Sequence, residues 1–103
     1  MNSIDLTALL WLIASDDAQS VAEFETYEKE AYRILRKHSG VLLHVVRLNQ
    51  DEHTPFEIHF IRFAARNAYE AFLVDPERSR LSATREKVIA RTLIFEGRQG
   101  PSY

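Results

Sequence analysis

Four short runs of apolar residues, rich in branched and aromatic side chains, constrain what this chain can fold into. Each run has the length of a β-strand and is bounded by polar or turn-forming residues, a pattern that predicts strands. The predicted strands cover residues 7–14, 41–46, 55–63 and 91–97. The second and third are joined by a polar segment, residues 48–55, that is suited to a hairpin loop.

The segment between the first and second strands predicts an amphipathic helix. Apolar residues recur along it at helical spacing, and charged residues fill the opposite side. The apolar positions are Val21, Phe24, Ala31, Ile34 and Leu35. We expect Ser20 to cap the start of this helix, with Glu23 completing a capping box, and Gly40 to close its end.

The segment between the third and fourth strands predicts a second helical region that is broken in two. Ala68, Phe72 and Leu73 form one apolar stripe, which we expect to face the core. A proline disfavours helical geometry in the residue before it, so Asp75-Pro76 interrupts the helix. Because Asp75 is a good N-cap and Pro76 a good first residue, a further helical segment is predicted over about residues 76–88.

The resulting order, βαββαβ, is that of the split βαβ or ferredoxin-like arrangement, an α+β fold. Right-handed crossovers would place both helical regions on one face of a four-stranded antiparallel sheet. A chain of 103 residues is long enough for one hydrophobic core and short for two. We therefore expect a single domain over residues 1–103.

Both faces of this sheet are predicted to be apolar. A sheet covered on one side should alternate apolar and polar residues, but residues 9–13 and 41–43 are consecutive apolar residues. The helical regions can cover only one face, and soluble monomers rarely expose a large apolar patch. A second copy of the same sheet, in a closed two-fold interface, would cover the other face. The sequence thus predicts a homodimer.

The charge and composition argue against several kinds of partner. The net charge of −2 is unlike that of nucleic-acid-binding proteins, which normally carry a basic face. The chain has no cysteine, which excludes disulfides and thiolate chemistry and is compatible with a cytoplasmic location. The apolar run at residues 6–14 is far below the roughly 20 residues that cross a bilayer. A signal peptide carries basic residues before its apolar run, and none precedes this one. We therefore expect no membrane partner.

Two local motifs accompany this order of elements. The first helix ends in His-x-Gly, here His-Ser-Gly at residues 38–40, and the second helical region is broken at Asp-Pro-Glu, residues 75–77. Roughly residues 24–97 resemble the dimeric α+β barrel superfamily. The resemblance is greatest to a small bacterial branch of unknown function, related to the antibiotic-biosynthesis monooxygenase-like proteins. Relatives include cofactor-independent monooxygenases, haem degraders, isomerases and proteins of no known activity, so the resemblance implies the fold but no particular reaction.

The candidate site lies on the hairpin of the second and third strands. If Leu48 pairs with Pro55, His44 lies opposite His59 on one face, and Arg62 lies on the other. A slip of one residue would place the two histidines on opposite faces. We take His59, His44 and Arg62 as the candidate site residues, and we expect His59 to be buried in a polar pocket.

Three interpretations of these residues compete. In the first, His44 and His59 are hydrogen-bonded residues that line the dimer interface and have no further role. In the second, His59, His44 or Arg62 orients a polar substrate or moves a proton in a small-molecule pocket, since histidine titrates near neutral pH. In the third, His44, His59 and Glu57 hold a metal ion, although nothing in the sequence has the spacing of a zinc motif.

The function that we predict is an activity on a small, partly apolar organic compound, in a pocket between sheet and helices. No metal, nucleotide or other cofactor is expected. Haem-degrading relatives use a set of Asn, Trp and His residues that this chain does not match. Its only tryptophan, Trp11, lies in the first predicted strand, and that strand contains no matching asparagine. The alternative is a non-enzymatic binding or assembly protein, and no catalytic motif decides whether the chain is an enzyme.

Overall fold

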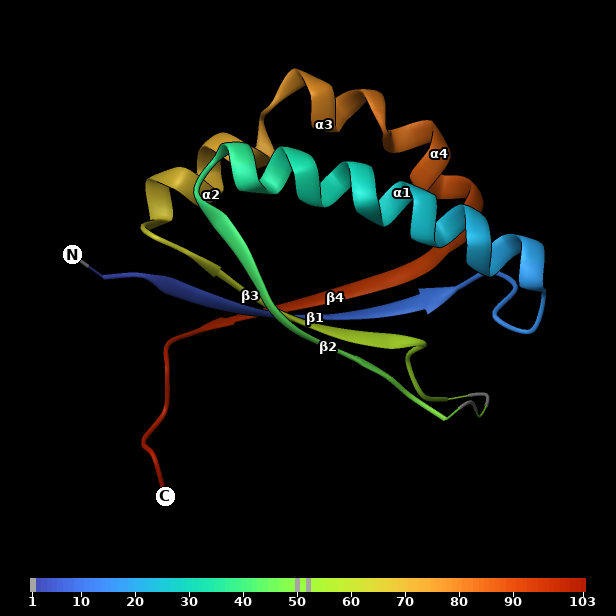
Figure 1. Cartoon of the computed structure of the whole chain (residues 1–103), viewed down its shortest axis with the longest axis horizontal. Coiled ribbons are helices and arrows are strands. Elements are labelled where there is room, and N and C mark those ends of the chain that lie inside the picture. The colour runs from blue at the N-terminus through green and yellow to red at the C-terminus, as the bar shows by residue number, and fades with distance from the viewer. Residues whose placement is uncertain (1, 50, 52) are drawn as a thin grey trace.

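The computed structural model describes residues 2–49, 51 and 53–103, so the predicted hairpin loop contains two positions, Gln50 and Glu52, that lie outside the described residues. The described chain forms four strands and four helices (Figure 1). They are β1 (Ile4–Leu12), α1 (Ala18–Lys37), β2 (Gly40–Arg47), β3 (Glu57–Phe63), α2 (Arg66–Leu73), α3 (Pro76–Arg80), α4 (Ser82–Val88) and β4 (Ile89–Gly97). The predicted order is confirmed, but the second helical region is broken into three helices and not two, because the segment after Asp75-Pro76 is interrupted at Leu81.

The strands form one antiparallel sheet in the order β2-β3-β1-β4. The helices all lie on one face of this sheet (Figure 1), as expected for the ferredoxin-like α+β fold. β1 begins earlier than predicted because Asp5 pairs in the sheet with Arg62 of β3, which accommodates a carboxylate within the strand. No helix in the described ranges combines the length and apolar character that a membrane span needs.

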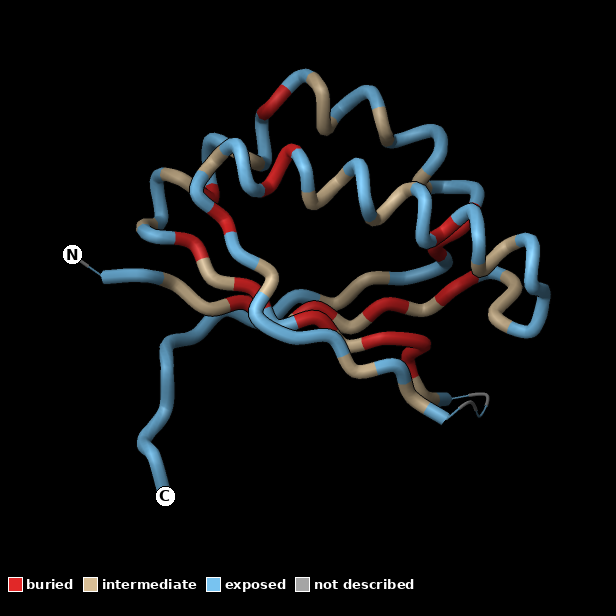
Figure 2. Tube along the Cα trace, in the orientation of Figure 1, coloured by how far each residue is buried: buried red, intermediate tan, exposed pale blue. Residues whose placement is uncertain are grey.

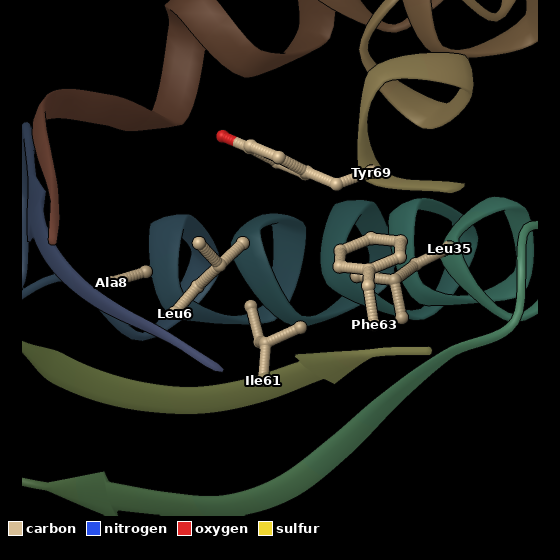
Figure 3. Close-up of a cluster of buried hydrophobic side chains, with 6 residues drawn as sticks. All are labelled: Leu6, Ala8, Leu35, Ile61, Phe63 and Tyr69. Atoms are coloured by element: carbon tan, nitrogen blue, oxygen red, sulfur yellow. The ribbon is translucent and has the colours of Figure 1, made fainter. Parts of the chain in front are cut away.

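The hydrophobic core lies between the sheet and the helices, because alternate residues of β1 and β3 face the helices and are buried (Figure 2). One cluster, drawn in Figure 3, consists of Leu6, Ala8, Leu35, Ile61, Phe63 and Tyr69. A second cluster consists of Leu10, Leu12, Phe24, Phe56, Val88 and Ile89. Both clusters join α1 to the middle strands, so α1 is fixed over β1 and β3.

The apolar stripe predicted on α2 is only partly correct. Ala68 and Phe72 pack against the first cluster, but Leu73 is exposed. Leu73 is the last residue of α2, and Tyr69 takes the most buried position of the helix instead. The predicted stripe therefore omitted the residue that contributes most to the core.

Both ends of α1 differ from the prediction. Asp17, and not Ser20, is the N-cap, and its carboxylate accepts a hydrogen bond from the Ser20 N–H at 3.1 Å. At the other end Ser39, with φ 62°, adopts the left-handed conformation expected of Gly40. Gly40 begins β2 and is needed for close packing, because a Cβ there would lie 2.5 Å from Leu35 Cγ.

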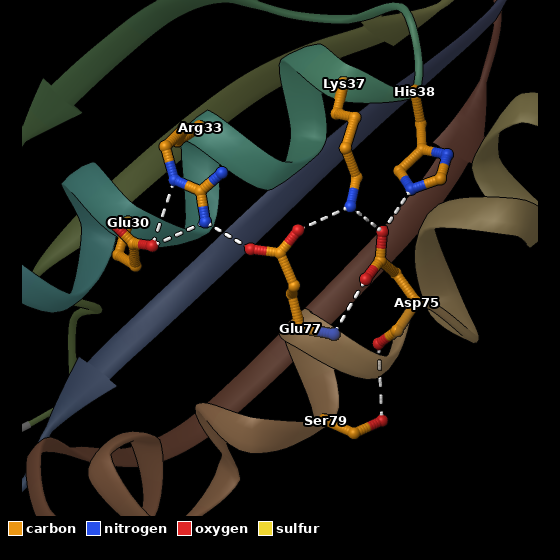
Figure 4. A network of polar contacts seen from close by, with 7 residues as sticks. All are labelled: Glu30, Arg33, Lys37, His38, Asp75, Glu77 and Ser79. Carbon is orange, nitrogen blue, oxygen red and sulfur yellow. Dashed lines mark hydrogen bonds and ion pairs between the residues drawn. The ribbon is translucent and has the colours of Figure 1, made fainter.

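Asp75 joins the end of α1 to the start of α3 (Figure 4). As predicted, it caps α3: its Oδ1 accepts a hydrogen bond from the Glu77 N–H at 2.7 Å. Its Oδ2 accepts from Lys37 Nζ at 2.7 Å and from His38 Nε2 at 2.6 Å. These hydrogen bonds, that of Lys37 first, hold the pKa of Asp75 well below its usual range. The motifs at residues 38–40 and 75–77 are thus in contact.

The face of the sheet opposite the helices, called the open face here, is largely apolar. Successive residues of a strand point to opposite faces, and paired residues of neighbouring strands point to the same face. The side chains on the open face therefore include Leu9, Trp11, Ile58, Phe60, Leu93 and Phe95. Phe60 is 36% exposed and Phe95 58% exposed. Large aromatic side chains are seldom exposed in this way on the surface of a monomer.

Substitution of Gly40 by alanine should destabilise the fold. The added Cβ would overlap the buried side chain of Leu35, so we expect Gly40→Ala to lower the free energy of unfolding by about 1–3 kcal/mol. Gly97→Ala is the matched control, because no heavy atom lies within 4 Å of its Cβ position. That change should stay within about 0.5 kcal/mol. Equal urea midpoints for the two variants would contradict this account of Gly40.

Candidate functional site

A β-bulge in β2 changes the predicted register of the β2–β3 hairpin. The predicted pairing holds from Gly40 to Leu42, but Leu43 is then an extra residue on β2. His44 consequently pairs with Phe60 on the open face, where it is exposed and its ring stacks on that of Phe60 with 6.2 Å between centroids. The predicted pairing of His44 with His59 is wrong, because the bulge shifts each later residue by one position.

Arg62 also lies on the open face. Its Nε donates to Asp5 Oδ1 at 2.7 Å and its Nη2 to Asp5 Oδ2 at 3.0 Å. This bidentate contact lowers the pKa of Asp5 and occupies the guanidinium group. His59 points to the other side of β3, into the helix layer. Of the three candidate residues, the structure therefore places only His59 between the sheet and the helices.

His59 is the centre of a hydrogen-bond chain that joins β3 to α1. Its side chain is 2% exposed, its Nε2 lies 2.8 Å from Glu57 Oε1, and its Nδ1 contacts the hydroxyl of Tyr32 on α1. An ionised carboxylate can only accept a hydrogen bond, so Nε2 carries a proton and donates a hydrogen bond to Glu57. In the neutral ring Nδ1 then accepts the hydrogen bond of the Tyr32 hydroxyl. The predicted burial of His59 among polar groups is confirmed.

Glu57 is kept ionised by its neighbours. Burial raises the pKa of this carboxyl, but hydrogen bonds from His59 and Arg47 outweigh burial, so its pKa is lowered. Arg47 Nε donates to Glu57 Oε2 at 2.7 Å, and Arg47 Nη2 donates to Glu25 on α1 at 3.1 Å. The bulge makes these contacts possible, because it brings Arg47 opposite Glu57.

Glu28, a buried carboxyl beside His59, can exchange a proton near neutral pH. Its side chain is 15% exposed and its Oε2 lies 3.7 Å from His59 Nδ1. Burial raises the pKa of Glu28 to about 7, with His59 opposing and the charge of Glu57 adding to the rise. Burial, followed by the charge of Glu28, also raises the pKa of the Tyr32 hydroxyl far above its usual value. Tyr32 therefore keeps its proton while Glu28 can gain or lose one.

Glu28 and Tyr32 lie in the wall between two cavities. The outer cleft, between α1 and the edge of β2 and β3, has a volume of about 490 Å³ and is also lined by His59. The inner cavity, of about 100 Å³, lies beneath α1 and is lined mainly by apolar side chains of the core. Glu28 and Tyr32 line both spaces. A small molecule in either space would meet the same carboxyl and hydroxyl groups.

The residues considered as metal ligands are not brought together. His44 lies on the open face, whereas His59 and Glu57 point toward the helices. Within the ranges that the structure describes, no group of three or more His, Asp or Glu side chains is placed to hold a metal ion. The metal set of His44, His59 and Glu57 is therefore wrong.

Glu28 and Tyr32 are not among the site residues predicted from the sequence. A signal for Glu28 was present, because Phe24, Glu28, Ala31 and Leu35 recur at helical spacing, which places Glu28 on the apolar face of α1. A carboxylate at a core position is rare unless it is paired or functional. Tyr32 follows Glu28 by four residues and so lies beside it on the helix.

No protein-family model matches the chain, and no curated protein matches it. Solved structures do match. A protein of unknown function from Rhodopseudomonas palustris has a TM-score of 0.81 at 9% identity, covering 98% of this chain and 85% of that chain. A DABB family protein with a ferredoxin-like fold from Mesorhizobium loti has a TM-score of 0.70 at 16% identity, covering 98% and 100%.

Two further solved structures carry descriptions that bear on assembly and chemistry. A dimeric protein of unknown function from Bacteroides fragilis has a TM-score of 0.70 at 10% identity, covering 96% of this chain and 98% of that chain. SnoaB from Streptomyces nogalater, described as a cofactor-independent oxygenase, has a TM-score of 0.67 at 13% identity, covering 97% of each. These similarities show that the chain has a ferredoxin-like fold, as its sequence predicted.

Proposed function

We propose that this protein is a general acid–base catalyst that acts on a small, partly apolar organic compound without a metal or nucleotide cofactor. The observation that carries the proposal is the position of Glu28. This carboxyl, with a pKa of about 7, lies beside a buried Glu57–His59–Tyr32 chain and faces two cavities. A general base is most effective when its pKa is close to the working pH.

In the proposed reaction Glu28 removes an acidic proton from the substrate. The C–H or O–H bond of the substrate breaks, its electron pair stays on the substrate as an enolate or phenolate, and the proton is held on the Glu28 carboxyl. Tyr32 presents a hydroxyl group whose orientation is fixed by His59. His59 is in turn oriented by Glu57. His59 is therefore assigned a positioning role, and Glu28 and Tyr32 are the residues that would touch the substrate.

The lining of the two cavities supports a substrate that is small and partly apolar. Phe24, Leu42 and Val45 contribute apolar surface to the outer cleft, and core side chains surround the inner cavity. A chemistry that needs only proton transfer from the protein also agrees with the description of one protein of this fold as a cofactor-independent oxygenase. A chain without cysteine is compatible with action in the cytoplasm, which we propose as its location.

We further propose that the functional form is a homodimer in which two open faces pack together. The support is the apolar character of the open face, with Phe60 and Phe95 exposed, and the description of a protein of the same fold as dimeric. An interface between two copies of one face can close with two-fold symmetry and leave no apolar surface free. The cavities around Glu28 lie on the opposite side of the sheet and would stay accessible.

Hydrogen–deuterium exchange at the acidic carbon of small aryl ketones in D₂O, followed by NMR, tests the proposed chemistry. We expect the protein to catalyse this exchange and Glu28→Gln to lower its rate by about 100-fold or more, the usual contribution of a general base. Glu23→Gln, at an exposed position on the same helix, should leave the rate unchanged. Binding of the ketones without catalysed exchange would instead support the non-enzymatic alternative.

The raised pKa of Glu28 should make stability depend on pH. The folded protein binds this proton more tightly than the unfolded chain does, since the pKa rises from 4.5 to about 7. The contribution is fully present below pH 4.5 and is lost as the pH rises through about 7. At about 1.4 kcal/mol per pKa unit, it is worth at most about 3.5 kcal/mol. Chemical denaturation between about pH 5 and pH 8 should show this loss relative to Glu28→Gln, and a constant difference between the two proteins would contradict it.

Sedimentation equilibrium tests the proposed dimer. We expect the protein to sediment at micromolar concentration with twice the mass of the 12.0 kDa chain. Phe95→Glu should convert it to a monomer, because a charge would be placed in the interface. Val74→Glu is the control, since Val74 is 76% exposed but follows α2 on the helix side. A monomeric mass for the unsubstituted protein would contradict the proposed dimer.

A further inference from the structure

Two arginine side chains from α3 and α4 line one cleft at the edge of the helix layer. Arg78 and Arg85 are seven residues apart, and this spacing places them on the same side even though Leu81 separates the two helices. With Tyr27, Ser79 and Ser82 they line a space of about 530 Å³, which we call the arginine cleft. Arg78, Arg85 and Tyr27 also line the inner cavity. The arginine cleft therefore adjoins the inner cavity that Glu28 and Tyr32 also line.

Neither arginine forms a salt bridge with a residue that the structure describes. Arg78 donates through Nη1 to the Leu73 carbonyl at 3.2 Å, and its guanidinium lies over the Phe72 ring at 5.1 Å. Arg85 donates through Nη2 to the Thr92 hydroxyl. Arg85 also forms a hydrogen bond with the Tyr27 hydroxyl. A guanidinium has five N–H donors, so these contacts leave donors of both groups available. By contrast, the arginines that form salt bridges with carboxylates within the described ranges are Arg33, Arg47, Arg62 and Arg66.

The charges of both guanidinium groups act on Tyr27, and the charge of Arg85 also acts on Glu28, the proposed general base. Burial raises the pKa of the Tyr27 hydroxyl, and the charges of Arg85 and Arg78 oppose that rise. The charge of Arg85 also acts on Glu28, after burial and the charges of His59 and Glu57. Two partly exposed, like-charged groups that share a cleft attract an anion, and the fork of a guanidinium matches the oxygens of a carboxylate or phosphate.

We infer that the arginine cleft binds the oxyanion group of the substrate. Arg78 and Arg85 hold the anion, Tyr27 and the serine hydroxyls border it, and the apolar body of the molecule extends into the inner cavity toward Glu28 and Tyr32. The substrate class is then a small organic acid with an apolar body. This inference rests on the proposed function, because it names the substrate of the same site.

Three probes of similar shape test the inference: phenylacetate, phenyl phosphate and the neutral phenylacetamide. Binding is followed by NMR through the backbone amide signals of Tyr27, Ser79 and Ser82. We expect at least one of the two anions to bind about tenfold more tightly than the amide, as charge-assisted hydrogen bonds would provide. Whichever anion binds more tightly identifies the oxyanion as a carboxylate or a phosphate.

The variants Arg78→Gln and Arg85→Gln separate this role from a structural one. Each should remove most of the preference for the anion over the amide, a ratio that does not depend on how much of the variant is folded. Arg80→Gln is the matched control, because Arg80 ends the same short helix as Arg78 and is exposed. It should keep the full preference.

Equal affinity for anion and amide in the unsubstituted protein would overturn the inference, and so would a preference that survives both substitutions. Neither outcome would contradict the proposed function, because that function depends on Glu28. If Glu28→Gln still abolishes deuterium exchange when the anion preference is absent, the catalytic role stands and the arginine cleft does not. If the anion preference is present but exchange is not catalysed, the cleft stands as a binding site alone.

Discussion

The hydrogen bonds of His59 are the interactions on which the rest of the site depends. A buried imidazole without partners would cost several kcal/mol on the scale of unpaired polar groups, and here both ring nitrogens are satisfied, by Glu57 on β3 and by Tyr32 on α1. Because Tyr32 is held at this point, α1 is fixed in rotation above the sheet. Glu28, one turn earlier on α1, must then face the interior, where burial gives it a pKa of about 7.

A second polar contact holds the other helices in place. Asp75 is buried against Lys37 and His38 at the end of α1 and caps α3 at the same time. The position of α3, and with it that of Arg78, is thereby fixed relative to the helix that carries Glu28. The His-Ser-Gly motif at residues 38–40 and the Asp-Pro-Glu motif at residues 75–77 form the two sides of this contact, because His38 donates to Asp75.

The fold could be predicted from the sequence because each element is specified locally, by strand-length apolar runs, the helical spacing of α1 and the break at Asp75-Pro76. The site could not be predicted in the same way. Its geometry depends on one extra residue, Leu43, that changes the register of β2. As a result His44 pairs with Phe60 and Arg47 pairs with Glu57. Nothing in the local sequence distinguishes Leu43 from the apolar residues beside it. The helical periodicity of α1 could have placed Glu28 on its apolar face. The pKa of Glu28, however, depends on burial by residues distant in the sequence.

The tautomer of His59 tests the account most directly, since the orientation of Tyr32 and the position of Glu28 both follow from it. Long-range ¹H–¹⁵N NMR of the imidazole, recorded at a pH where the ring is neutral, distinguishes the two forms. The hydrogen-bond chain requires a proton on Nε2, which donates a hydrogen bond to Glu57, and an unprotonated Nδ1, which accepts a hydrogen bond from Tyr32. A neutral ring with its proton on Nδ1 would contradict the hydrogen-bond chain and the site built on it.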